Sequence, residues 1–157
     1  MGPRSAVKWW HYCYHSCMRV VIDTNIFLGA CLGLGAANHV IAACLRGQAT
    51  PLMGTTLFSE YEDVLHRSEL FRKSRLNAKE RESLLDIFMA KCEWVRIYYA
   101  WRPNLRDEGD NHLVELAIAG AAQAIVTRNL RDVARMELNF PHLKVCSPEV
   151  LLQELKR

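Results

Sequence analysis

The sequence predicts an α/β fold: a three-layer α/β/α sandwich with a mainly parallel central sheet. Short apolar runs of strand length alternate with longer segments of helical periodicity. The run Val20–Ile22 is wholly apolar, as in a strand covered on both faces. Alternating strands and helices place the strands side by side in one parallel sheet.

The first half of the chain contains two predicted strands and three predicted helices. The first strand ends at Ile22, and the glycines that follow, at 29, 33 and 35, indicate a flexible turn. A helix over 36–46 stops at Gly47, which is placed for a C-terminal cap. A strand at 51–53 and a helix over 57–67 come next. Asn77 with Glu80 three residues later forms a capping box for the third helix.

The second half repeats this alternation. A strand is expected at 94–98 and a loop at 102–107. The segment DNHLVELAIAGAAQAIVTRN predicts a helix from Asp110, a stop at Gly120 and a buried strand at 124–127. A last strand at 143–146 precedes a terminal helix, which Ser147 caps and Pro148 begins.

Length and composition indicate one domain. The chain has 157 residues, 50% of them hydrophobic and 24% charged, which is ordinary for a globular protein. No apolar run approaches the roughly 20 residues that span a bilayer, and no signal peptide is evident. We therefore expect a cytoplasmic protein without membrane association. The domain is expected over 18–157, with residues 1–17 a disordered extension or sequence upstream of a natural start at Met18.

Residues 1–17 do not make a convincing metal site or a basic arm. Their segment WWHYCYHSC alternates histidines and cysteines at a spacing unlike a zinc finger, and no second ligand pair follows. The remaining cysteines lie in apolar or helical surroundings, as small hydrophobic residues do. The net charge of +3 falls to +1 without Arg4 and Lys8. Net charge alone thus gives little attraction to nucleic acid.

Three acids are expected to meet at the carboxyl edge of the sheet, where α/β proteins bind ligands. Asp23 ends the first strand. Helical periodicity places Glu60 at the margin of an apolar face, and Asp110 on the side of its helix that faces the core. Asp23 at the start of a helix is also explained by simple capping, but three converging acids require a cation. All-oxygen ligands favour Mg²⁺ or Mn²⁺, which commonly serve phosphoryl chemistry.

Three sequence blocks resemble the PIN-domain family in order and spacing: VVIDTNIF, FSEYEDVL and RDEGDNHLVELAIAGAAQAIVTRNLRDV. The resemblance covers Arg19 to Leu155 and is greatest to the bacterial toxin components of toxin–antitoxin systems. It implies a Mg²⁺- or Mn²⁺-dependent endoribonuclease with an α/β/α sandwich. It also implies inhibition by a cognate antitoxin protein and a homodimer.

The resemblance assigns roles residue by residue. Asp23, Glu60 and Asp110 match the family's first three acids and are the expected metal ligands, although Asn111 leaves a one-position ambiguity at the third. The fourth acid is replaced by Asn129, with Asp132 a possible substitute. An amide ligand carries no charge, so the number of metal ions is left open.

Two other functions are compatible with parts of this pattern. A haloacid-dehalogenase-like phosphatase also begins with a strand and an Asp, but Asn25 stands where that family has its second acid. A catalytically impaired module that binds RNA or an antitoxin is suggested by Asn129. The sequence does not identify the RNA or the antitoxin.

Two contact surfaces are also predicted. RNA phosphates are expected at a basic stretch composed of Arg67, Arg72, Lys73, Arg75, Lys79 and Arg81, although most such runs are merely solvated. An antitoxin is expected to insert a basic side chain near Asp23 and Asp110, because an acidic cleft attracts cations.

Overall fold

A parallel five-stranded sheet forms the centre of the computed structural model, which describes residues 18–97, 111–130 and 142–156. Within these ranges the strand order is β3-β2-β1-β4-β5, and every neighbouring pair is parallel. The strands are β1 (Met18–Ile22), β2 (Ala49–Met53), β3 (Glu93–Trp94), β4 (Ala124–Val126) and β5 (Lys144–Cys146). The predicted parallel sheet is confirmed.

Strand β1 occupies the middle of the sheet. Its last three residues, Val20 to Ile22, are at most 1% exposed. Val20 lies opposite Pro51 of β2 and Ala124 of β4. The next residue, Asp23, therefore emerges at the centre of the carboxyl edge, flanked by the ends of two other strands.

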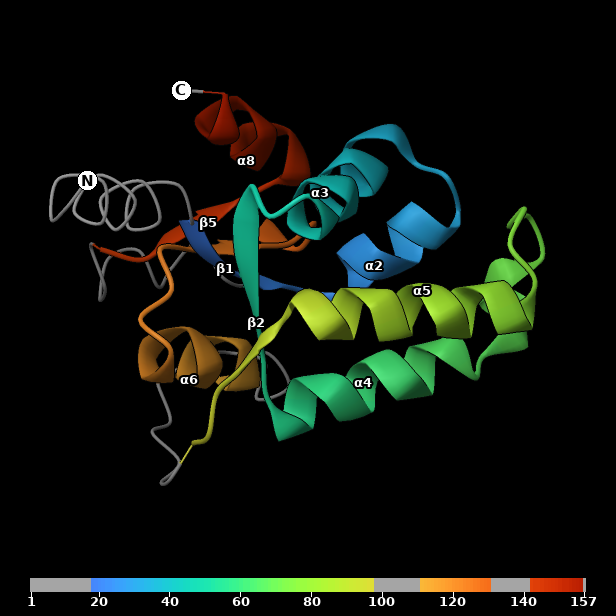
Figure 1. Cartoon of the computed structure of the whole chain (residues 1–157), viewed down its shortest axis with the longest axis horizontal. Coiled ribbons are helices and arrows are strands. Elements are labelled where there is room, and N and C mark those ends of the chain that lie inside the picture. Colours follow the sequence, from blue (N-terminus) through green and yellow to red (C-terminus); the bar gives the residue numbers. More distant parts are fainter. Residues whose placement is uncertain (1–17, 98–110, 131–141, 157) are drawn as a thin grey trace, which may run out of the picture.

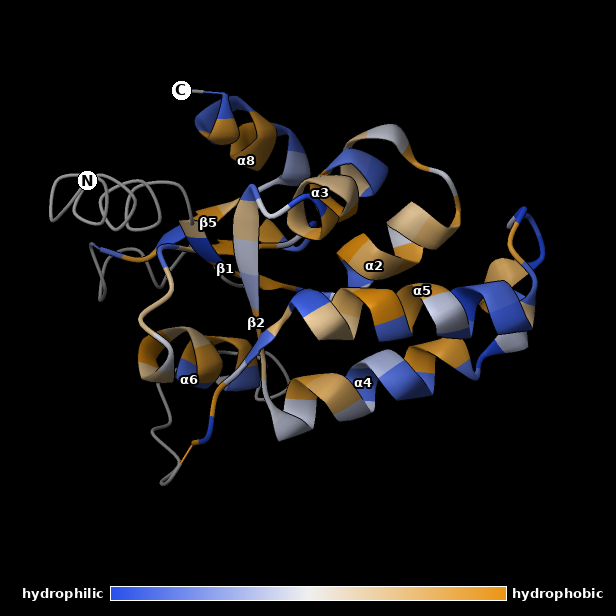
Figure 2. Cartoon of the chain, viewed as in Figure 1, coloured by the Kyte–Doolittle hydropathy of each residue, from blue (hydrophilic) through white to orange (hydrophobic). Residues whose placement is uncertain are grey.

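Helices cover both faces of the sheet (Figure 1). Helices α3 (Gly35–Leu45) and α8 (Pro148–Leu155) pack together on one side, and α6 (Asn111–Ala119) contacts β1, β2 and β4 on the other. Figure 2 shows apolar stretches in each of these helices, and their residues Val40, Leu113 and Leu151 are buried. This arrangement is the predicted three-layer sandwich.

Two further helices, α4 (Thr55–Leu65) and α5 (Ala78–Lys91), run side by side away from the sheet (Figure 1). A 3-10 helix, η1 (Ser68–Phe71), follows α4. Buried aromatic rings join this hairpin to the core. The Phe27 ring lies 5.3 Å from that of Tyr61 and 5.7 Å from that of Phe88, measured between centroids. These rings fix α4 beside the helix that starts at the carboxyl edge.

That helix, α2 (Thr24–Cys31), corrects the prediction of a flexible turn around Gly29. Gly29 lies inside the helix, where a Cβ would meet the Cβ of Ala37 at 3.0 Å. The glycine therefore permits close packing of α2 on α3. The turn is confined to residues 32–34, where Gly33 adopts a φ of +77°.

The predicted helix ends are largely confirmed. The Asn77 side chain accepts from the Glu80 N–H at 2.8 Å, and the Glu80 carboxylate accepts from the Asn77 N–H at 3.0 Å. Gly47 has a φ of +80°, a conformation that glycine adopts without strain. The strand expected at 94–98 is shorter, because β3 covers only Glu93–Trp94.

No single helix in the described part of the chain is long and apolar enough to cross a membrane. Helices α2 and α3 meet that requirement only as a pair, and they are bent by 104° relative to each other. Both contribute buried side chains to the core.

The described cysteines behave as the predicted small hydrophobic residues. Cys31, Cys44 and Cys146 are buried, and Cys92 is half-buried. Burial raises the pKa of Cys31 to about 11 and those of Cys44 and Cys92 to about 12. These thiols remain protonated and unreactive at neutral pH.

Candidate active site

Asp23 follows directly after β1, its backbone is fixed by a hydrogen bond, and its side chain does not cap the following helix. Its N–H donates to the carbonyl of Val126 at 3.0 Å, which joins it to β4. It occupies the N-cap position of α2, yet its carboxylate makes no capping hydrogen bond. The simple capping explanation is therefore wrong.

The Asp23 carboxylate is held by three neutral donors. Oδ2 accepts from the Thr127 hydroxyl at 2.7 Å and from the Asn25 amide at 3.2 Å, and Oδ1 accepts from the Thr24 hydroxyl at 3.3 Å. Only 8% of the residue is exposed. The carboxylate is consequently fixed in orientation by residues from two elements.

No positively charged side chain in the described ranges pairs with Asp23. A buried carboxylate loses hydration worth roughly several kcal/mol, and neutral hydrogen bonds recover only part of it. Asp23 thus combines a fixed position with a charge that no cation among the described residues balances. A bound cation would supply the missing charge.

Thr127 and the residues that follow β4 are linked by hydrogen bonds to Asp23 and Asn25. Besides donating to Asp23, the Thr127 hydroxyl accepts from the Asn129 N–H at 3.0 Å. The Arg128 N–H donates to Oδ1 of the Asn25 side chain at 3.4 Å. The predicted fourth-position residue, Asn129, therefore lies in a turn that is hydrogen-bonded to the same hydroxyl as Asp23.

Tyr61 places the Glu60 helix against the end of β1. Its hydroxyl donates to the carbonyl of Ile22 at 2.6 Å, one residue before Asp23. Burial is the main cause that raises the pKa of Tyr61 well above its ordinary value, so it stays a neutral donor. Glu60 is the preceding residue on α4, the helix that this hydrogen bond ties to the end of β1.

The Glu60 carboxylate contacts His112 of α6. The His112 Nε2 lies 3.1 Å from Oε1 of Glu60, and the two side chains are 13% and 42% exposed, respectively. The other ring nitrogen, Nδ1, is buried and has no hydrogen-bond partner among the described residues. His112 therefore anchors an acid that would otherwise be free to move, and α6 is tied to α4 beside the site.

The remaining predicted ligands, Asp110 and Asp132, lie outside the described residues. Among those that are described, no group of three His, Cys, Asp or Glu side chains is placed to hold a metal ion. Asp23 has features of an oxygen ligand, because it is buried, fixed by hydrogen bonds and unpaired with a cation among the described residues. These features fit Mg²⁺ or Mn²⁺, and a complete site would need Asp110.

The sequence matches a family model over residues 19–131, and the model describes a PIN domain. The chain belongs to the PIN-domain family. PIN domains as a family are nucleases, and they generally use divalent metal ions. The match includes both Asp23 and Glu60, together with the turn that bears Thr127 and Asn129.

One solved structure is similar in fold. It is described as the crystal structure of VapBC2 from Rickettsia felis bound to a DNA fragment from their promoter. The TM-score is 0.53 at 18% sequence identity, and the alignment covers 83% of this chain and 98% of that one. No curated protein sequence matches the chain. The structural match supports the PIN fold.

Five residues of the site were not predicted as part of it: Thr24, Asn25, Thr127, Tyr61 and His112. Thr127 is the last residue of the strand predicted at 124–127. The available signal for Thr127 was its position at a strand end next to Asp23, since polar residues there face the same edge.

Proposed function

We propose that this PIN-domain protein is a Mg²⁺- or Mn²⁺-dependent endoribonuclease that hydrolyses RNA phosphodiester bonds. One observation carries the proposal: Asp23 is 8% exposed, held by three neutral donors, and unpaired with any cation among the described residues. Such a carboxylate at the carboxyl edge of a parallel sheet is suited to metal binding.

In this proposal Asp23, Glu60 and Asp110 hold the metal. The bound ion would activate water and stabilise charge on the scissile phosphate. The Thr127 hydroxyl and the Asn25 amide orient Asp23, and His112 orients Glu60. Asn129 and Asp132 are the candidates for the fourth position, where an amide leaves the second metal site with less negative charge.

Cleavage mapping on total cellular RNA tests this function. The wild-type protein should cleave with Mg²⁺ or Mn²⁺ and stop when the ion is chelated. Glu60→Gln should lose at least about tenfold in rate, because it replaces an anionic ligand with a neutral one of the same shape. Glu62→Gln on the exposed face of α4 is the matched control and should retain full activity. Equal cleavage by both variants would refute the assigned site.

We also infer that a cognate antitoxin silences the nuclease. The similar structure is described as VapBC2, and the sequence resembles toxin components of such pairs. An acidic edge with an unneutralised Asp23 attracts a basic side chain, and an Arg fork can pair with carboxylates through two hydrogen bonds. A homodimer and a cytoplasmic location belong to the same proposal.

The second candidate function is a catalytically impaired module that binds RNA or an antitoxin. The presence of Asn129 in place of an acid favours it. RNA binding that needs no divalent ion, with no cleavage under any metal, would select this module. The family match favours a nuclease over the haloacid-dehalogenase-like phosphatase.

A further inference from the structure

The connection between α4 and α5 presents a concentration of exposed positive charge. We call residues 67–79 the hairpin tip; it lies at the end of the helical pair that is farthest from the sheet (Figure 1). Five of its side chains are exposed cations: Arg67, Arg72, Lys73, Arg75 and Lys79. No ion pair among the described residues involves any of them.

Arg81 corrects the prediction that all six cations of this stretch form one surface. It is 7% exposed, and its guanidinium lies 4.1 Å from the centroid of the Phe71 ring. Its NH1 donates to the carbonyl of Leu76 at 2.8 Å. Arg81 therefore supports the tip from inside, while the other five cations face solvent.

Hydrogen bonds and packing contacts order the hairpin tip. The Ser74 hydroxyl donates to the carbonyl of Cys31 at 2.7 Å and accepts from the Leu76 N–H at 3.1 Å. Phe71 is 5% exposed beneath the guanidinium of Arg81. The capping box of Asn77 and Glu80 closes the start of α5. These contacts hold the exposed cations at a fixed distance from the rest of the protein.

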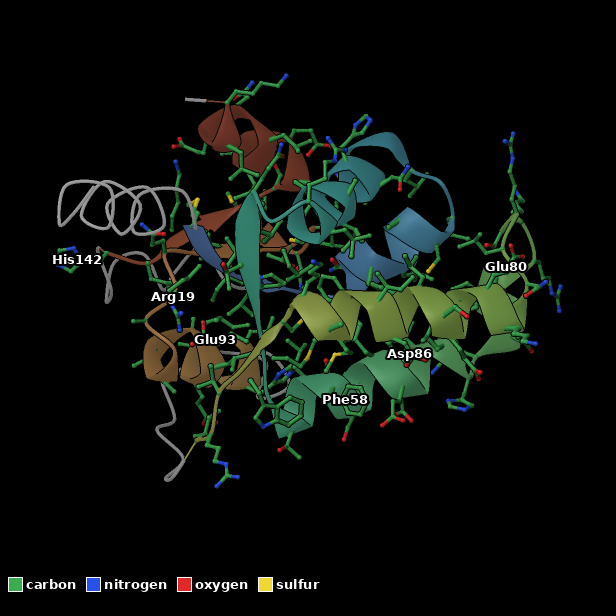
Figure 3. The ribbon with its side chains drawn as sticks, in the orientation of Figure 1. Arg19, Phe58, Glu80, Asp86, Glu93 and His142 are labelled. Atoms are coloured by element: carbon green, nitrogen blue, oxygen red, sulfur yellow. The ribbon has the colours of Figure 1, made fainter. Side chains whose placement is uncertain are left out.

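Nearby acids do not neutralise the tip. Glu69 is the single acid within residues 67–79, and Glu80 follows directly, at the start of α5 in Figure 3. The Glu80 carboxylate is occupied by the Asn77 N–H. The excess of positive charge therefore remains available to an anionic partner.

Helix α2 sets the spacing between Asp23 and Ser74, the residue that anchors the tip to this helix. It starts directly after Asp23 and ends at Cys31, whose carbonyl accepts from Ser74 of the tip. Its 8 residues correspond to about 12 Å at 1.5 Å per residue. A stacked strand rises about 3.4 Å per nucleotide, so this spacing corresponds to about four nucleotides.

We propose that the hairpin tip binds the phosphate backbone of the RNA substrate about four nucleotides from the bond to be cleaved. The inference rests on the proposed ribonuclease function and adds a second contact region to it. Backbone contacts of this kind carry no sequence information, so the tip contributes affinity and orientation. An acidic protein segment is the competing partner that the test must distinguish.

Fluorescence anisotropy with single-stranded RNA of about twelve nucleotides tests the proposal. It gives Kd at each salt concentration, and log Kd varies with log salt in proportion to the number of phosphates contacted. EDTA keeps binding separate from cleavage. The double variant Arg72→Gln, Lys73→Gln should bind about tenfold or more weakly at about 50 mM salt and lower the salt slope by about 1.4. The matched control Arg46→Gln, Lys156→Gln, at the ends of α3 and α8, should leave both unchanged.

Binding of a shorter RNA provides the second measurement. RNA of about three nucleotides is too short to reach from the site to the tip, so the double variant should bind it like wild type. An unaltered salt slope with the longer RNA would overturn the proposal, as would a slope that falls equally in the control. Weaker binding to poly-glutamate with unchanged RNA binding would instead assign the tip to an acidic protein. RNA binding through the tip without any cleavage would sustain this inference and defeat the proposed nuclease.

Discussion

The Thr127 hydroxyl donates a hydrogen bond of 2.7 Å to Oδ2 of Asp23, and both groups are buried at the carboxyl edge of the sheet. The two residues are 104 positions apart, at the ends of neighbouring strands β4 and β1. This bond joins the first block of the PIN-domain pattern to the last. It also fixes one oxygen of the carboxylate that we assign to the metal.

Thr127→Val should weaken metal binding by about 10- to 100-fold, because it removes the donor that orients Asp23 while preserving side-chain shape. Thr127→Ser keeps the hydroxyl and should restore most of the affinity. Calorimetric titration with Mn²⁺ measures both variants. Equal affinities for the valine and serine variants would show that the hydroxyl does not orient the ligand.

The contact between His112 and Glu60 should appear as coupling in a double-mutant cycle. His112→Ala releases the Glu60 carboxylate, so cleavage should slow even though the acid is still present. In a Glu60→Gln background the same histidine substitution should have a much smaller effect. The cycle needs the cleavage rates of wild type, the two single variants and the double variant, all at one fixed pH in saturating Mg²⁺. Strictly additive effects would mean that His112 acts independently of Glu60.

The buried Cys44 thiol should make the fold sensitive to alkali. Below pH 9.0 the thiol is protonated in both the folded and unfolded states, so its burial does not oppose folding. Above pH 9.0 the unfolded thiol ionises, whereas burial holds the folded pKa at about 12. Stability should therefore fall with rising pH between these values, by up to roughly 1 kcal/mol per pH unit for this group.

Urea denaturation of wild type and Cys44→Ala at several pH values measures this effect. The variant should start from lower stability at neutral pH, because it leaves a small cavity, but lose less stability between pH 9.0 and about 12. An equal loss of stability with rising pH in the two proteins would contradict the raised pKa of Cys44.

Antitoxin and metal should compete if the antitoxin inserts a basic side chain beside Asp23. Linkage then requires that excess Mg²⁺ or Mn²⁺ weaken antitoxin binding, and that the antitoxin weaken metal binding by the same factor. Affinity measurements on the co-expressed pair across a metal titration, at constant ionic strength, test this. Antitoxin binding that is independent of metal would place its inhibitory contact away from the acids.

Much of the fold was predictable because its signals are local. The apolar run of β1, the capping box at Asn77 and the helical face of α4 each depend on residues within a few positions of one another. The exception is α2, where glycines suggested a turn. Gly29 serves the packing of α2 on α3, and the sequence does not reveal which helix will approach it.

The candidate site was predictable only in part. Asp23 and Glu60 carry recognisable spacing, and Asp23 lies at the end of β1; Asp110 and Asp132 lie outside the described residues. The supporting contacts depend on pairs distant in sequence, such as Tyr61 with Ile22 and His112 with Glu60. Arg81 shows the same limit, since charge patterning does not distinguish a buried arginine from an exposed one.

Calorimetric titration of Mn²⁺ into Asp23→Asn tests the central claim most directly. The substitution keeps the shape of the side chain and removes its charge, and Asp63→Asn on the exposed face of α4 is the matched control. We expect Asp23→Asn to lose at least about tenfold in affinity, since it removes an anionic oxygen ligand, and the control to bind like wild type. Unchanged Mn²⁺ affinity in a folded Asp23→Asn protein would contradict the assignment of Asp23 as a metal ligand.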